Sequence, residues 1–182
     1  MRIIGGRWRG RRLPVAALPG LRPTGDRIRE TLFNWLQPHL AGSSCLDLFA
    51  GSGAIGLEAA SRGAGEVILV EQAGAGARAL QDAVRRLDAQ DHVQVVNSDA
   101  IAYLQLQQRH FDIIFLDPPF DSPLLETALS VIAERDLLRP GGLAYLETPR
   151  QAQPPELPSG WALARDRQAG QVRFMLATNA GA

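Results

Sequence analysis

The tetrapeptide Asp117-Pro118-Pro119-Phe120 is the part of the sequence best equipped for chemistry. It directly follows the apolar run 111–116, which predicts a buried strand. Because proline has no N–H and a fixed φ, two prolines end sheet pairing and turn the backbone away at once. A carboxylate, two carbonyl oxygens and an aromatic ring then stand at the carboxyl end of a strand, where open α/β sheets bind ligands. Such a turn suits a planar group that carries an amine, such as a nucleobase; the alternative is a Pro-Pro turn with a surface Phe.

A glycine-rich loop supplies a second candidate site. Gly51, Gly53 and Gly56 satisfy the G-x-G-x-x-G pattern, which lets a backbone approach a ligand closely. Asp47 ends the preceding strand, four residues before the first glycine. A carboxylate there would repel a pyrophosphate and suits a cationic ligand, such as an amino group or a sulfonium.

Two further acids follow the next two expected strands. Glu71 is placed to accept both hydroxyls of a ribose, and Asp99 to accept an adenine amine. Together with Asp47 they predict an adenosine that carries a positive charge, which describes S-adenosylmethionine. Each acid alone could instead cap the loop or helix that follows it. The predicted cofactor-binding residues are Asp47, Phe49, Ala50, Gly51, Ser52, Gly53, Gly56, Glu71, Gln72, Ser98, Asp99, Ala100 and Asp117.

These residues need a parallel sheet to bring them together, and the sequence predicts one because strands alternate with helices. A final pair of strands around 168–171 predicts an antiparallel hairpin instead. The expected strands are 45–49, 67–70, 93–96, 111–116, 142–147, 161–167 and 172–177, and the expected helices are 24–40, a helix ending at about 62, 73–87, 100–106 and 124–133.

Charge is distributed unevenly over the 182 residues, which fit one domain with a small appendage. Residues 1–40 carry eight arginines and two acids, a net charge of +6, and the remainder carries −6. We expect a basic arm over 1–23, with a short hairpin, and a catalytic domain over 24–182. A basic arm suggests a polyanionic partner. The chain has no lysine, which a GC-rich coding sequence also explains.

The arm and the helix after it hold the predicted RNA contacts. Trp8 could stack on a base or pack the hairpin against the body, and Arg27 could border the site or belong to a solvated helix start. The predicted RNA-binding residues are Arg7, Trp8, Arg9, Arg11, Arg12, Arg22, Thr24 and Arg27.

Other site classes find little support. Cys45 is the single cysteine, so no intrachain disulfide or thiolate cluster forms. His39, His92 and His110 lack ligand spacing, so we expect no metal. Neither a signal peptide nor a membrane span is expected, which favours the cytoplasm.

The chain resembles the class I S-adenosylmethionine-dependent methyltransferases at 47–56, Glu71, Asp99 and 117–120. The motifs Arg2-Ile3-Ile4-Gly5-Gly6, Arg9-Gly10-Arg11 and the segment 22–34 resemble the RsmD family more specifically. That resemblance implies a Rossmann-like, seven-stranded, mostly parallel sheet with helices on both faces. It also implies a monomer that methylates the N2 amine of one guanine in 16S rRNA of the small ribosomal subunit or its assembly intermediate, with Asp117, Pro118, Pro119 and Phe120 as catalytic residues.

Three other functions stay open. A DNA adenine-N6 or cytosine-N4 methyltransferase shares the Pro-Pro-aromatic motif, although 182 residues leave little room for a target-recognition region. A nicotinamide-dependent dehydrogenase fits the glycine pattern and Glu71 but gives 117–120 no role. A non-catalytic RNA-binding module is the third.

Overall fold

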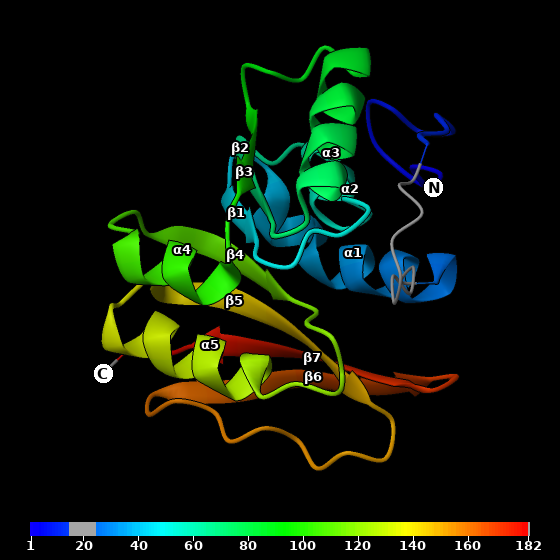
Figure 1. Ribbon diagram of the computed structural model, residues 1–182. Coiled ribbons are helices and arrows are strands. Elements are labelled where there is room, and N and C mark those ends of the chain that lie inside the picture. The colour runs from blue at the N-terminus through cyan, green and yellow to red at the C-terminus, as the bar shows by residue number, and fades with distance from the viewer. Residues whose placement is uncertain (15–24, 182) are drawn as a thin grey trace.

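A seven-stranded sheet forms the centre of the molecule, in the order β3-β2-β1-β4-β5-β7-β6 (Figure 1). The computed structural model describes residues 1–14 and 25–181. Strands β1 to β5 are parallel, and β7 pairs antiparallel with both β5 and β6. The strands are Ser44–Asp47 (β1), Glu66–Glu71 (β2), Val93–Asn97 (β3), Phe111–Leu116 (β4), Leu138–Pro149 (β5), Trp161–Ala169 (β6) and Val172–Asn179 (β7).

Five helices cover the two faces of this sheet. Helices α1 to α3 pack on one face and α4 and α5 on the other, and each face has its own apolar cluster. Side chains alternate between the clusters along a strand, so Tyr145 belongs to the first and Leu146 to the second. The helices are Asp26–Leu40 (α1), Gly56–Ser61 (α2), Gly74–Arg86 (α3), Ala100–Leu106 (α4) and Leu124–Glu134 (α5). None of these helices is long and apolar enough to cross a membrane, in the part of the chain described.

The strand order reverses between β1 and β4, which lie side by side at the centre of the sheet. Asp47 of β1 is in register with Leu69 of β2 on one side and Phe115 of β4 on the other. The carboxyl ends of these strands therefore form one edge, which we call the carboxyl edge. Ligands of open α/β sheets bind at such a reversal point.

The predicted alternation of strands and helices and the final antiparallel hairpin are confirmed. The largest difference is β5, which begins at Leu138 instead of Gly142. Leu138 pairs with Phe111 despite the Arg-Pro-Gly-Gly sequence that follows it, and the register shifts by a bulge between Phe111 and Ile113. The expected cap of α1, Thr24, lies outside the described residues; Gly25 occupies the N-cap position without a side-chain hydrogen bond.

The amino-terminal segment 1–14 forms the expected hairpin, with a single antiparallel bridge between Arg2 and Arg12. It is seated on the body of the protein. Ile3, Trp8 and Leu13 are buried in the cluster that also contains α1, α2 and α3. This segment therefore extends the core of the domain.

Candidate functional site

The predicted site residues of the parallel strands meet at the carboxyl edge. Asp47 is the last residue of β1 and Glu71 the last of β2, in register with Asn97 of β3. Asp117 follows β4, two residues beyond Phe115, the partner of Asp47. Parallel pairing brings the acids together, because all these strands end on the same side.

The glycine loop is shaped by steric limits at three positions. Gly51 and Gly53 have φ of +52° and +76°, a region that favours glycine. A Cβ at Gly53 would lie 2.6 Å from Cδ2 of Leu80. At Gly56 it would lie 2.2 Å from Cδ2 of Leu69 and 3.0 Å from Oδ2 of Asp47. The loop thus starts α2 directly above the end of β1.

Glu71 ties this loop to the neighbouring strand. Its Oε2 accepts a hydrogen bond from the Gly51 N–H at 2.9 Å, and its Oε1 accepts one from the Ala73 N–H at 2.7 Å. Asn97, which the sequence analysis missed, donates from Nδ2 to the carbonyl oxygens of Glu71 and Gln72 at 2.8 and 2.9 Å. An Asn directly after a strand, opposite a predicted ligand-binding acid, was the available signal. The carboxylate of Glu71 is half-buried and fixed in place at the edge.

Asp47 has the most perturbed environment of the predicted site. The residue is 3% exposed, and its Oδ2 accepts a hydrogen bond from the Gly56 N–H at 2.9 Å. Burial, together with the charges of Asp117 and Glu71, raises the pKa of this carboxyl from 3.8 to about 7, against backbone hydrogen bonds that lower it. Among the described residues, the groups that shift the pKa of Asp47 include no cation. A positive group placed beside this acid would therefore be attracted to it.

Asp99 plays the capping role that the sequence left open as an alternative. It is the N-cap of α4, and its Oδ1 accepts a hydrogen bond from the Ala102 N–H at 2.9 Å. The residue is exposed, while Ala100 beside it is buried. A carboxylate has two oxygens, so capping through one is compatible with ligand binding through the other.

The turn after β4 has a graded exposure. Pro118 is buried, Asp117 and Phe120 are half-buried, and Pro119 is exposed. Phe120 packs against the cluster on the α1 face. Ser122, another residue that the sequence analysis missed, donates from Oγ to the Pro119 carbonyl at 2.6 Å and holds the turn closed.

A buried tyrosine–glutamate pair continues the acidic edge onto β5. Tyr145 donates from Oη to Oε1 of Glu147 at 2.6 Å, and Glu147 is 3% exposed. Burial raises the pKa of Tyr145 well above its usual value, and the charges of Glu147 and Asp117 add to this effect. The sequence analysis took Glu147 only as the end of a strand, although an acid ending an apolar strand was the same signal that identified Glu71.

The predicted RNA contacts of the arm are separated from this edge. Arg7 donates from its backbone N–H to the Ser61 carbonyl, and Arg11 donates from Nη1 to the Arg86 carbonyl, at 2.7 and 3.1 Å. Ser61 and Arg86 end α2 and α3, whose next strands begin on the opposite side of the sheet. Arg7, Arg9 and Arg11 thus lie toward the amino ends of the strands. Arg22 and Thr24 lie outside the described residues.

Trp8 is better explained by packing than by RNA stacking. Its side chain is 3% exposed and stacks on His92, with ring centroids 5.8 Å apart. The backbone N–H of Trp8 donates to Oγ of Ser61 at 3.0 Å. A ring enclosed in this way does not offer a face to a base, so the packing alternative accounts for it. Arg27, by contrast, is exposed in the first turn of α1.

A buried ion network that the sequence analysis missed anchors the arm. Glu58 is fully buried and accepts hydrogen bonds from the N–H groups of Ile4 and Gly5 at 2.8 and 2.7 Å. It also pairs with Arg62 at 2.7 Å and with the buried Arg29 at 3.5 Å. Arg29 in turn donates to the Ala54 carbonyl in the glycine loop.

A hollow of about 340 Å³ lies at the opposite edge of the sheet, near His39, Asp112 and Arg139. It includes none of the predicted site residues. The strand ends and the chemistry of the residues present, rather than the size of a hollow, therefore locate the candidate site at the carboxyl edge.

Comparison with known proteins agrees with this geometry. The family model described as "Conserved hypothetical protein 95" matches residues 1–178. Ribosomal RNA small subunit methyltransferase D of Escherichia coli strain K12 is 46% identical over 176 residues, covering 97% of this chain and 88% of the relative. The protein of the same name from Haemophilus influenzae is 43% identical and covers 98% and 94%.

The chain belongs to the ribosomal RNA small subunit methyltransferase D family. A solved putative methyltransferase from Escherichia coli has a TM-score of 0.88 and 45% identity, covering 98% of this chain and 97% of that one. The Thermus thermophilus 16S rRNA N2 G1207 methyltransferase, solved with AdoMet and guanosine, has a TM-score of 0.68 and 26% identity, covering 91% of this chain and 45% of that one. The methyltransferase fold thus extends over nearly the whole chain.

Proposed function

We propose that this protein transfers a methyl group from S-adenosylmethionine to the exocyclic N2 amine of a guanine in 16S rRNA of the small ribosomal subunit. One observation carries the proposal: Asp117 stands two residues beyond Phe115, which is in register with Asp47 below the glycine loop, so the turn after β4 and this loop lie at the same edge of neighbouring strands. The proposed amine acceptor and the proposed cofactor loop therefore share one site. The relatives' names supply the RNA class.

The residues present fit the proposed cofactor. Asp47 is a buried acid beside other acids, a setting that favours a cationic group. Glu71 and Asp99 offer carboxylate oxygens at the next two strand ends. Gly53 and Gly56 leave no room for a Cβ against Leu80 and Leu69, which keeps the loop and the start of α2 close to Asp47. When bound, S-adenosylmethionine supplies an electrophilic methyl group on a sulfonium.

The turn after β4 prepares the amine. The lone pair of a guanine N2 amine is delocalised into the ring, which makes the nitrogen a weak nucleophile. Asp117 and the Pro118 carbonyl can accept its two hydrogens and so draw the lone pair out of the ring plane. Phe120 can hold the base by stacking, worth about 1–3 kcal/mol. Since the methyl group is already reactive, orientation dominates, and alignment of this kind lowers barriers by roughly 7–11 kcal/mol.

The target base must leave its stack to reach this turn, at a cost of a few kcal/mol that is smallest for a base in a single strand. We place the target at guanine 966, which the family resemblance implies and no relative's name states. The same resemblance implies that the protein acts as a monomer in the cytoplasm, on the small subunit or its assembly intermediate.

The test is transfer of tritiated methyl groups to small-subunit particles that lack the modification, followed by mapping of the labelled nucleoside. The Asp117→Ala variant should lose transfer at least a hundredfold while S-adenosylhomocysteine still binds. Asp121→Ala is the matched control, because Asp121 is an exposed acid in the same loop. Full activity of Asp117→Ala, or label on duplex DNA instead of rRNA, would overturn the proposal.

A further inference from the structure

Three exposed arginines stand at the carboxyl edge on the β5 side of the sheet, outside the arm. Arg150 directly follows β5, Arg167 lies in β6 near its end, and Arg27 lies in the first turn of α1. We propose that these three residues form a phosphate-binding rim for RNA beside the methyl-transfer site. This proposal rests on the proposed function, because it names the surface that would hold the substrate while Asp117 receives the base.

The position of the hairpin tip follows from its register. Pro149 at the end of β5 pairs with Val172, and Val172 pairs with Ala169, so the turn at 170–171 lies at the carboxyl edge. β5 is the neighbour of β4 in the sheet, and Leu146 is in register with Leu116. The tip therefore lies at the same edge of the sheet as the turn that contains Asp117, with the end of β5 between them.

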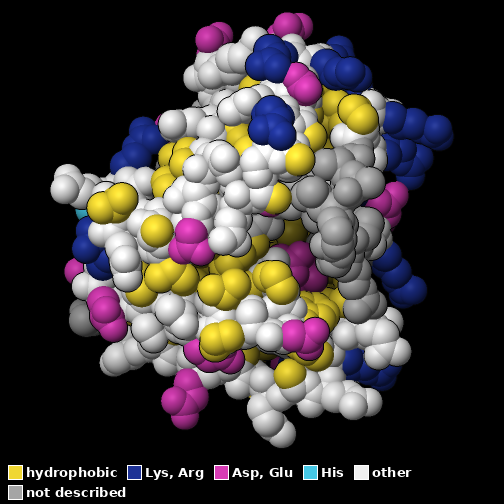
Figure 2. Space-filling model, in the orientation of Figure 1, with side chains coloured by type: hydrophobic (Ala, Val, Ile, Leu, Met, Phe, Trp, Pro, Cys, Tyr) yellow, Lys and Arg dark blue, Asp and Glu magenta, His cyan; other side chains and the backbone are white. Residues whose placement is uncertain are grey.

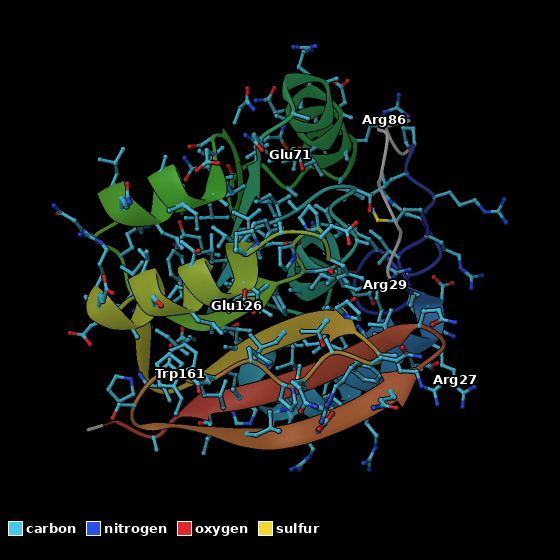
Figure 3. All side chains as sticks on the ribbon, turned by 60° about the horizontal axis from the view of Figure 1, so that its bottom comes forward. Arg27, Arg29, Glu71, Arg86, Glu126 and Trp161 are labelled. Atoms are coloured by element: carbon cyan, nitrogen blue, oxygen red, sulfur yellow. The ribbon has the colours of Figure 1, made fainter. Side chains whose placement is uncertain are left out.

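Arg27 reaches the same region from the other chain end. Helix α1 packs on β7 through Trp35 and Phe174, whose ring centroids lie 5.3 Å apart. Phe174 pairs with Arg167 across the hairpin. Arg27 lies about two turns before Trp35, at the end of α1 near the carboxyl edge, where Arg29 donates to the Ala54 carbonyl of the glycine loop. Figure 3 shows Arg27 at the end of the molecule where the hairpin tip also lies.

The hairpin holds its arginines with neutral groups. Arg150 donates from Nε to Oε1 of Gln168 at 3.2 Å and from Nη1 to the Gly170 carbonyl at 3.3 Å. Arg167 donates from Nη1 to the Asp166 carbonyl at 3.3 Å. Within the described residues, no ion pair is formed by Arg27, Arg150 or Arg167. Their charges are therefore available, and a guanidinium has five N–H donors, more than these contacts use.

The acid next to Arg167 in the hairpin, Asp166, forms its ion pair with Arg173. Asp166 accepts two hydrogen bonds from Arg173, at 3.0 and 2.5 Å. Neighbouring residues of a strand point to opposite faces, so Arg167 stands on one face of the hairpin while Gln168, with Arg150 bonded to it, stands on the other. A nucleic-acid strand that crosses the tip would meet an arginine on each side.

RNA is the partner that fits, because arginine forks match phosphate and the adjacent turn is built for a base amine. Figure 2 shows arginine side chains at the top and along the right-hand margin of the view, and acidic and apolar groups nearer its centre. Basic groups around an acidic centre would hold the backbone of a strand while one nucleotide enters. The arginines of the arm, which lie toward the opposite edge, would contact RNA farther from the target.

The experiment compares wild type with the Arg150→Gln/Arg167→Gln double variant in binding to 16S rRNA and to unmethylated small-subunit particles over a salt series. Loss of two phosphate contacts should reduce the slope of log K against log salt by about 1.4 to 1.8. The KM for particles should rise about tenfold or more, with S-adenosylhomocysteine affinity unchanged and kcat at saturating substrate within twofold.

Arg135→Gln is the matched control, since Arg135 is exposed and also donates to a backbone carbonyl, that of Gln107 at 2.9 Å, but ends α5 at the opposite edge. It should leave slope and KM unchanged. An unchanged slope and KM in the double variant, with wild type active, would refute the rim and leave the proposed function standing. An inactive wild type would instead refute the proposed function.

Discussion

The buried carboxylates of Asp47 and Glu58 lie close together in the sequence, but the groups that surround them differ in charge. Glu58, in the middle of α2, is surrounded by the guanidinium groups of Arg29 and Arg62 and by two backbone N–H groups of the arm. Asp47, just below the start of α2, has one backbone N–H at 2.9 Å and other acids nearby.

The difference separates a structural charge from one that serves a ligand. A buried charge is tolerated when cations and hydrogen bonds replace water, as around Glu58. A buried acid without such cations is costly in its ionised form. Proteins keep such acids at sites where a bound ligand offsets this cost. The charge of Glu58 is therefore already matched within the protein, whereas the surroundings of Asp47 agree with our proposal that a cationic ligand binds at the carboxyl edge.

The largest expected effect is on the stability of the ion network around Glu58, which anchors the arm. Glu58→Gln places a neutral amide among donors and cations, and breaking a buried pair in this way costs about 3–5 kcal/mol. The melting temperature should fall by roughly 10 °C in calorimetry. Glu66→Gln is the control, because Glu66 pairs with Arg109 at 2.8 Å while both side chains are partly exposed, at 38% and 51%. That change should cost less than about 1 kcal/mol; equal losses would erase the distinction between the two settings.

The second effect is the pH dependence of stability due to Asp47. Its folded pKa of about 7 lies above the unfolded value of 3.8, so the folded state binds the extra proton between these values. Stability from this group is therefore present at low pH and is lost as pH rises from about 4 through 7, on the order of 4 kcal/mol in total. Asp47→Asn should remove this part of the slope in denaturant titrations at pH 5 and pH 8. If the difference between wild type and variant does not change with pH, Asp47 is not buried as described.

The third effect is on the affinity for S-adenosylmethionine, which we propose binds beside Asp47. Affinity for S-adenosylmethionine should rise as pH increases from 6 to 8, because a cation favours ionised Asp47 and releases its proton. Asp47→Asn should weaken binding about tenfold or more, as expected for a hydrogen bond to a charged group worth roughly 1.5–3 kcal/mol, and should flatten this pH dependence. Calorimetric titration in buffers of different ionisation enthalpy measures both. Unaltered affinity in the variant would assign Asp47 to loop structure alone.

The smallest effect comes from Asp99, an exposed acid at the same edge. Asp99→Ala removes the cap of α4 and should cost about 1 kcal/mol, while Asp99→Asn keeps the acceptor and should be nearly neutral in stability. Thermal melts of the two variants give the comparison. A large loss in Asp99→Asn would mean that its charge, and not its cap, supports the fold.

The sequence predicted most of the parallel sheet because its signals are local. The apolar runs 67–70 and 111–116 are followed directly by Glu71 and Asp117, and parallel pairing places these acids and Asp47 at one edge. The cofactor and catalytic roles of these residues stay predictions. The first residues of β5, 138–141, were missed. Their Pro-Gly-Gly sequence resembles a loop, and only the pairing of Leu138 with β4 makes this segment part of a strand.

Buried charge was harder to predict than sheet order. Glu58 sits between alanines and leucine in a short helix, where a glutamate is usually solvated. Only the arm, whose contacts cross more than fifty residues of sequence, buries it. Trp8 was ambiguous for the same reason, since its arginine-rich neighbours suggest a surface and its partner His92 is remote in sequence.

The seating of the arm also affects the order in which the protein can mature during translation. Trp8 stacks on His92, and Arg11 contacts the end of α3, so the arm is synthesised well before the residues on which it docks. Chains elongate at about 5–20 residues per second, so the arm must wait several seconds with its apolar side chains uncovered. A protein proposed to modify nascent small subunits would thus bury its own arm only after the strands and helices up to His92 have been synthesised.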